Sequence, residues 1–100
     1  MARYILLAMN GPTSPDEDAA YNAWYDETHV PDLLACPAVK SARRFRAVQQ
    51  KGLNNPYVAL YEIETDDIQA VLAQLPAPDV PFFDRSCSTS IVAVEMESGD

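Results

Sequence analysis

Histidine and cysteine are scarce in this chain of 100 residues, which contains one histidine, His29, and two cysteines, Cys36 and Cys87. A single histidine and two unrelated cysteines, without a Cys-x-x-Cys pair, cannot supply the ligands of a zinc site. We therefore expect no metal centre. Both thiols are expected to be reduced and partly buried, as is usual in a cytoplasmic protein.

Basic residues and long apolar runs are scarce as well. The 7 basic residues stand against 15 acidic ones, for a formal net charge of -8, and such a surface repels phosphate groups. We expect no nucleic-acid partner and no membrane partner. The apolar run over residues 4–9 is too short for a signal-peptide core or a membrane span. These features predict a cytoplasmic protein with a single domain at residues 1–97 and a C-terminal tail at residues 98–100.

The hydrophobic pattern predicts strands and helices in the order β-α-β-β-α-β. Strands are expected over residues 3–9, 39–48, 57–63 and 86–96, and helices over residues 15–28 and 66–74. This order predicts a ferredoxin-like α+β sandwich, with a four-stranded antiparallel sheet and two helices on one of its faces. The other face also carries apolar side chains, so a second copy of the chain is expected to cover it.

Local signals predict where the first helix begins and ends. Ser14 and Glu17 have the spacing of a capping box, with Pro15 at the first helical position between them. Pro31 disfavours helical geometry in the residue before it, so the helix is expected to end or kink near His29.

Most of the residues suited to chemistry gather between residues 21 and 32. Helical spacing places Tyr21, Tyr25 and His29 on one stripe. His29 is the side chain whose ordinary pKa lies nearest neutrality. It can act as a general acid or base, with Asp32 orienting its ring, or it can be a structural residue that caps the end of the helix.

Several aromatic residues are further candidates. Tyr25 can donate its hydroxyl to an oxyanion or can pack in the core, and Tyr21 is expected to pack. Trp24 is expected to anchor the helix on the sheet, and its alternative role is a wall for a flat substrate. Tyr61 shares a strand face with Tyr57, and the small residue between them leaves room either for a ligand or for ordinary packing.

The remaining candidates lie outside that segment. Asn10 ends the first strand, where it is expected either to start a turn or to reach the mouth of a pocket. Alternation along the second strand places Val39 and Arg44 on opposite faces. Arg44 is the basic residue that we expect to bind a carboxylate or phenolate, and its alternative is a solvated ion pair with an acid of the chain. Phe82 and Phe83, in a proline-rich loop, are expected to be buried in a dimer contact or to cap a pocket.

Three segments and the Asn10 that ends the first strand together carry a family resemblance. The segments are Tyr21-Asn22-x-Trp24-Tyr25-x-x-Thr28-His29-x-Pro31-Asp32-Leu33, Cys36-Pro37-Ala38-Val39-x-Ser41-Ala42-x-Arg44-Phe45 and Tyr57-x-Ala59-Leu60-Tyr61-Glu62-Ile63. They resemble the dimeric α+β barrel superfamily and, within it, the EthD-like and REDY-like group. The chain departs from that pattern at Ala38, where such proteins often have glycine.

The resemblance implies a homodimer that holds a small-molecule substrate in a pocket between sheet and helices, without a metal or organic cofactor. The function expected is acid/base catalysis by a cyclase, isomerase or lyase on a small aromatic, polyketide-like or enolisable compound. The alternative is a non-catalytic small-molecule binding protein, and a third possibility is a monooxygenase, either cofactor-free or with haem on His29. The expected catalytic residues are His29, Tyr25 and Asp32, and the expected substrate-binding residues are Trp24, Tyr61, Asn10, Arg44 and Tyr21.

Overall fold

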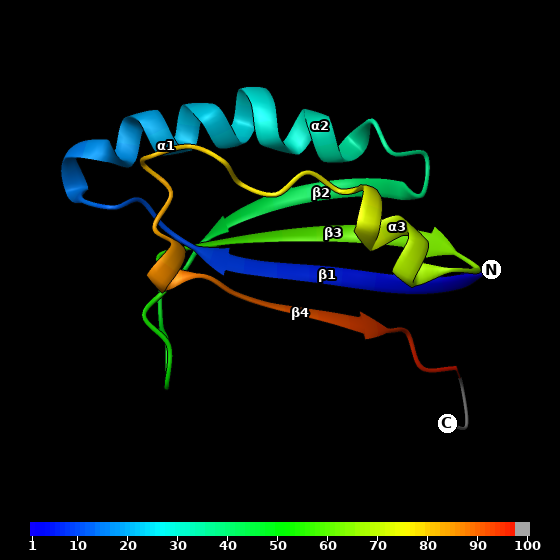
Figure 1. The fold of residues 1–100 in the computed structure, drawn as a ribbon. Coiled ribbons are helices and arrows are strands. Elements are labelled where there is room, and N and C mark those ends of the chain that lie inside the picture. The colour runs from blue at the N-terminus through cyan, green and yellow to red at the C-terminus, as the bar shows by residue number, and fades with distance from the viewer. Residues whose placement is uncertain (98–100) are drawn as a thin grey trace.

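The computed structural model describes residues 1–97, and its elements follow the predicted order. The sheet has the strand order β2-β3-β1-β4, and each neighbouring pair is antiparallel. A long first helix and the shorter helix α3 lie on the same face of this sheet (Figure 1). This arrangement confirms the ferredoxin-like α+β sandwich. The predicted tail at residues 98–100 lies outside the described residues. The strands are β1 (Ala2–Asn10), β2 (Val39–Arg46), β3 (Tyr57–Thr65) and β4 (Thr89–Val94), and α3 spans Ile68–Gln74.

The first helix is longer than predicted, because it continues past Pro31. It comprises a 3-10 turn (Pro15–Glu17), α1 (Asp18–Trp24), a π-helical turn (Tyr25–His29) and α2 (Val30–Leu34), drawn as one rod in Figure 1. In the π-helical turn the Val30 N–H donates to the Tyr25 carbonyl, five residues back. Pro31 follows this turn within the continuous helix and, because it lacks an N–H, donates no helical hydrogen bond. The predicted end near residue 28 is therefore wrong.

The first helix lacks the predicted capping box, whereas α3 has a side-chain N-cap. Ser14 makes no side-chain cap, and its backbone carbonyl accepts the N–H of Glu17 at 3.0 Å. The expected capping box is thus absent, because the first turn is a 3-10 turn closed by backbone groups. At α3, the Asp67 carboxylate accepts the N–H of Ala70 at 3.1 Å, as an N-cap should.

A bulge near the start of β2 changes the faces predicted for that strand. Val39 pairs with Ile63 and Ser41 pairs with Glu62, so one residue of β2 is extra. Val39 therefore turns toward the helices, where it is 5% exposed, on the same face as Arg44 rather than opposite to it. The predicted alternation holds only after the bulge.

The strand ends also differ from the prediction. β2 stops at Arg46, and the next N–H, of Ala47, donates to the Pro56 carbonyl at 2.9 Å. β4 begins at Thr89, because a 3-10 turn over Arg85–Cys87 precedes it. Asp84 caps that turn by accepting the N–H of Ser86 at 3.0 Å.

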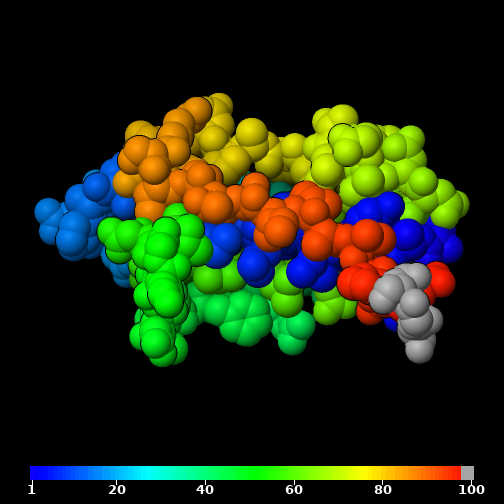
Figure 2. Space-filling view, turned by 90° about the horizontal axis from the view of Figure 1, so that it is seen from below, coloured from blue at the N-terminus to red at the C-terminus, as the bar shows by residue number. Residues whose placement is uncertain are grey.

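The two faces of the sheet carry different side chains. The helix-covered face holds an aromatic core in which Tyr21, Tyr25 and Tyr61 are each at most 1% exposed. The other face, seen in Figure 2, is not covered by another layer of residues 1–97, and it carries apolar side chains. Two of them, Ile5 and Ile91, are 39% and 52% exposed. The predicted apolar character of the open face is therefore confirmed.

The proline-rich segment after α3 is fixed to the loop after β1. The Thr13 N–H donates to the Phe82 carbonyl at 2.9 Å. Phe83 is 5% exposed and packs on Trp24, with 6.0 Å between the ring centroids. The prediction that Phe83 is buried in a dimer contact is wrong, because its ring completes the core of its own subunit.

The cysteines and the apolar segments were also the subject of sequence predictions. Cys36 and Cys87 are both free thiols and both partly buried, as predicted. Within residues 1–97, no helix is both long enough and apolar enough to cross a bilayer.

Candidate functional site

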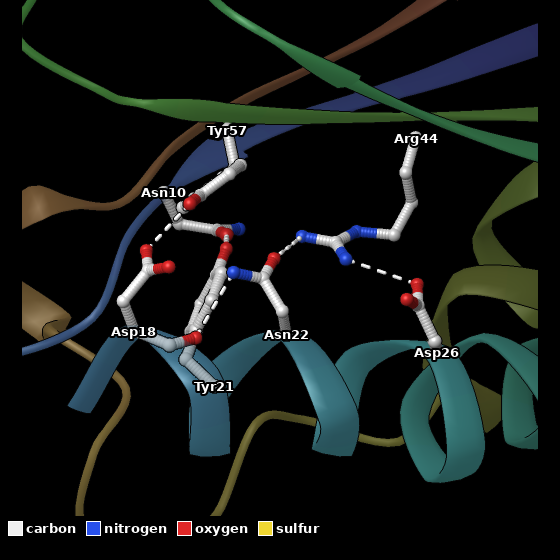
Figure 3. Close-up of polar contacts among 7 residues, drawn as sticks. All are labelled: Asn10, Asp18, Tyr21, Asn22, Asp26, Arg44 and Tyr57. Carbon is white, nitrogen blue, oxygen red and sulfur yellow. Dashed lines mark hydrogen bonds and ion pairs between the residues drawn. The ribbon is translucent and has the colours of Figure 1, made fainter.

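A group of polar and aromatic side chains lies between the sheet and the long helix (Figure 3). It draws on four elements: β1, β2, β3 and the helix over residues 15–34. Several of its polar groups are buried, and burying a polar group lowers the stability of a fold unless the group is hydrogen-bonded. We call it the tyrosine–arginine cluster, and its members are Asn10, Tyr21, Tyr25, Arg44, Tyr57 and Tyr61.

Simple periodicity places the tyrosines of this cluster. Tyr21 and Tyr25 lie one helical turn apart, and their ring centroids are 5.4 Å apart. Tyr57 and Tyr61 lie four residues apart on β3, so both face the helix. Tyr21 and Tyr57 stack across the interface with centroids 5.3 Å apart. Ala59, between the two β3 tyrosines, is 2% exposed, so the space that its small side chain leaves is filled by packing.

Asn10 ties two of the helix tyrosines to the end of β1. The Tyr21 hydroxyl donates to Asn10 Oδ1, and Asn10 Nδ2 donates to the Tyr25 hydroxyl at 3.3 Å. The asparagine is 4% exposed. It therefore lies inside the cluster, and its amide orients both phenols.

Arg44 brings a positive charge to the aromatic rings. Its guanidinium lies 4.4 Å from the Tyr25 ring centroid and 5.5 Å from that of Tyr57, both within cation–π range. Its two terminal nitrogens donate to Asp26 Oδ1 and Asn22 Oδ1, each at 2.9 Å. Its Nε is buried and has no hydrogen-bond partner among residues 1–97. Sequence reasoning offered an anion site or an ion pair at Arg44, and the structure contains the ion pair.

The buried phenols of Tyr21 and Tyr61 are held protonated. Burial is the main cause that raises the pKa of each hydroxyl above its ordinary value, and the neighbouring Tyr25 raises it further. The Arg44 charge acts in the opposite direction on both. The Tyr61 hydroxyl has no hydrogen-bond partner within the described part of the chain. The neighbouring Tyr25 hydroxyl acts on the pKa of Tyr61, yet the two hydroxyls form no hydrogen bond of ordinary geometry.

His29 lies in the π-helical turn and packs between aromatic rings. Its ring stacks on Trp24 with centroids 4.7 Å apart and meets Tyr25 edge-on at 5.0 Å. The side chain is 7% exposed, and burial lowers the pKa of His29 below 6.5, while the charge of Asp32 opposes that shift. His29 is therefore neutral at pH 7 and able to accept a proton.

The contacts of His29 depart from the geometry expected of a pocket base. No hydrogen bond to its ring nitrogens is found among residues 1–97, and Asp32 is exposed. Asp32 thus acts on the ring through its charge and not through a hydrogen bond that fixes a tautomer. The hollows described on residues 1–97 are lined by other side chains. Trp24 packs on its own helix and on Phe82 and Phe83 of the proline-rich segment, with ring centroids 6.0 Å apart, and its role as an anchor on the sheet stays a prediction.

One open hollow reaches the edge of the tyrosine–arginine cluster. It has a volume of about 370 Å³ and opens to solvent beside β2, and we call it the Arg44 hollow. Arg44 reaches it from inside the fold and Asp26 from the helix, as Figure 3 shows. Its lining residues are Asn22, Asp26, Arg44, Phe45, Arg46 and Tyr57.

Sequence reasoning missed the polar residues of the helix that meet this cluster. Asp18 accepts the Tyr57 hydroxyl at 2.5 Å, and Asn22 and Asp26 accept Arg44. A signal for them was present, since the three residues repeat every four positions on one helical stripe. That stripe runs beside the one that carries Tyr21 and Tyr25.

Comparisons of the chain with protein-family models, with curated proteins and with solved structures find no match. The ferredoxin-like architecture is established by the strand order and pairing alone. None of these comparisons supports the narrower resemblance to the EthD-like group.

Proposed function

We propose that the chain is a cofactor-independent, EthD-like enzyme that moves a proton on a small aromatic or enolisable compound. The observation that carries the proposal is the buried, unpartnered hydroxyl of Tyr61 beside the charge of Arg44. Leaving a buried donor unpaired costs about 1–3 kcal/mol. An oxygen anion that develops during a reaction would accept such a donor, and hydrogen bonds to ions are stronger than those between neutral groups.

The chemistry requires one base and one set of donors. Neutral His29 would take a proton from a carbon beside a carbonyl, or from a phenol, and its lowered pKa keeps it neutral for that step. The electron pair left behind would move onto the substrate oxygen. Tyr61 and Tyr25 would donate hydrogen bonds to that oxygen, with Arg44 as a nearby positive charge. Return of the proton from the imidazolium to another carbon would complete an isomerisation. In a cyclisation, the enolate carbon would first attack a second carbonyl carbon of the substrate, and the oxygen of that carbonyl would then take the proton.

A second candidate function, a non-catalytic binding protein, is favoured by the packing of His29. Its ring face lies against Trp24, and the described hollows lie elsewhere. A binding protein would use the tyrosine–arginine cluster without a titrating histidine. The same packing does not fit a haem on His29, because the indole occupies one ring face and the side chain is 7% exposed.

Deuterium exchange separates these two functions without knowledge of the natural substrate. The probes are 2-hydroxyacetophenone and 1-tetralone, which carry exchangeable protons beside an aryl ketone. We expect the protein to accelerate α-proton exchange in D₂O, followed by NMR. His29→Gln should lower the protein-dependent rate by about 100-fold or more, since general base catalysis contributes about 10²–10⁴-fold.

Tyr61→Phe and Tyr4→Phe form the matched pair for the donor role. Both remove one phenol oxygen from the helix-covered face, but only Tyr61 has the buried unpartnered hydroxyl. Exchange should fall in Tyr61→Phe and persist in Tyr4→Phe. Binding of both ketones with no exchange above buffer would assign the chain to the binding proteins.

We infer in addition that the functional unit is a homodimer closed by the open faces of two sheets. That face has a half-enclosed hollow of about 670 Å³, whose floor includes Ile5 and Leu60. Two ion pairs lie on the same face, between Arg43 and Glu62 at 3.4 Å and between Arg3 and Glu64 at 3.3 Å. Apolar side chains together with charges of both signs can pair with the same face of a second copy.

A further inference from the structure

The geometry points to a subsite in the Arg44 hollow for a carboxylate on a flat organic ligand, which enters by displacing Asp26 from Arg44. This inference rests on the proposed small-molecule function and names the class of its ligand. The starting observation is the ion pair within the chain, in which Arg44 donates a hydrogen bond to the Asp26 carboxylate at 2.9 Å. The carboxylate of a ligand could take the place of the Asp26 carboxylate and accept the same hydrogen bond.

The two sides of the Arg44–Asp26 pair differ in their surroundings. The Arg44 side chain is 17% exposed, whereas that of Asp26 is 64% exposed. Exposed carboxylates gain little from an ion pair, because water replaces the lost contact when they rotate away. Asp26 can therefore leave at small cost, while Arg44 stays buried and needs an anion. The asymmetry makes Asp26 the replaceable partner.

The rest of the subsite is fixed in place. Asn22 binds Arg44 at 2.9 Å, and its own amide donates to the Asp18 carbonyl at 2.9 Å. The guanidinium is held over the rings of Tyr25 and Tyr57. Because the Arg44 guanidinium is already held in place, it loses little further conformational entropy when it binds a carboxylate.

The hollow itself selects the rest of the ligand. Its volume of about 370 Å³ suits a small organic molecule and exceeds what a simple ion needs. Tyr57 offers an aromatic wall, and Arg46 adds a second positive charge. With Asp26 displaced, two cations face the ligand in a chain whose net charge is -8. An aromatic monocarboxylate matches this lining better than a free phosphate.

Calorimetric titration of the full chain with 2-naphthoate tests the inference. Asp26→Asn removes the competing carboxylate and its repulsion, and it should tighten 2-naphthoate binding by about tenfold. Glu27→Gln is the matched control, because it removes the same charge from the adjacent exposed position of the helix. It should change the affinity by less than about threefold. The neutral 2-naphthamide should bind all three proteins weakly and equally.

Arg44→Lys keeps the charge but removes the fork, and it should weaken 2-naphthoate binding in the Asp26→Asn background. Equal affinities in Asp26→Asn and Glu27→Gln would overturn the subsite, as would inorganic phosphate binding as tightly as 2-naphthoate. Ketone exchange that depends on His29, together with 2-naphthoate binding that ignores Asp26, would overturn this inference and leave the proposed enzyme intact. The reverse pair of results would leave the subsite and remove the enzyme.

Discussion

The two faces of the sheet differ in burial and in the side chains that they carry. The helix-covered face is buried under aromatic side chains, and Asn10 and Arg44 contact the tyrosines there. The open face combines aliphatic side chains such as Ile5 and Ile91 with exposed ion pairs such as that of Glu62. Burial of apolar area stabilises a fold most simply when no polar atoms are involved. The buried face nevertheless holds polar groups, and some of them have no hydrogen-bond partner among residues 1–97.

This difference separates stability from function. An all-apolar cluster under the helix would avoid the unpartnered Tyr61 hydroxyl and Arg44 Nε. Polar groups kept inside a core at such a cost are typical of functional sites. Conversely, an apolar face left in water is typical of an association surface. In the proposed function, the chemistry belongs to the covered face and assembly to the open face.

The largest expected effect comes from emptying the centre of the covered face. Tyr21→Ala removes a ring that is 0% exposed, and it should lower the free energy of unfolding by about 3–5 kcal/mol. Urea denaturation at one protein concentration measures the change. Val48→Ala, at a side chain 96% exposed, should stay within about 0.5 kcal/mol of the wild type. Similar losses in the two variants would remove the distinction between core and surface.

The open face is tested by a charge placed among its aliphatic side chains. Ile91→Glu should convert the expected dimer into a folded monomer, because a carboxylate buried in an interface costs several kcal/mol. Sedimentation velocity reports the mass, and circular dichroism reports the fold. Val48→Glu adds the same charge outside that face and should leave the dimer unchanged. A wild-type chain that sediments as a monomer at high concentration would refute the assembly half of the comparison.

Removal of a single tyrosine hydroxyl from the covered face should change the free energy of unfolding in a direction that depends on which tyrosine is changed. Tyr21→Phe loses the hydrogen bond to Asn10 and should cost about 1 kcal/mol of stability. Tyr61→Phe removes a donor without a partner, so it should be neutral or stabilising by up to about 1 kcal/mol. Thermal unfolding of the pair decides the sign. Equal destabilisation would show that the Tyr61 hydroxyl is structural and not reserved for a ligand.

The smallest effect is a pH dependence that originates in His29. Its pKa is below 6.5 when folded, so between that pKa and 6.5 the unfolded chain binds more protons. The contribution to stability is present above pH 6.5 and is lost as the pH falls through the folded pKa. His29→Gln should flatten this part of the curve of unfolding free energy against pH. Protonation should also quench Trp24, which stacks on the ring, with a midpoint below pH 6.5.

The sequence sufficed for the fold because that depends on patterns repeated along each element. Alternation and capping residues predicted the order of strands and helices, and the two tyrosine pairs followed from their spacing. The π-helical turn and the bulge near Val39 were not predicted, because neither follows from a pattern repeated along its own element. The contact of Arg44 with Asn22 joins residues 22 positions apart, across a β-strand and a helix. Such a pair is visible only once the layers are stacked.

The π-helical turn at Tyr25–His29 has a consequence for how this chain can vary. A π-helical turn holds one residue more than an α-helical turn, so losing one residue there and returning to ordinary winding would leave the two flanking parts of the helix nearly in phase. Leu33, now 3% exposed, would stay on the side on which Tyr21 is buried. A one-residue deletion should thus be better tolerated in this stretch than elsewhere in the helix, where it would turn everything on one side by about 100° about the axis. An aligned homologue with a gap here could keep the same layer.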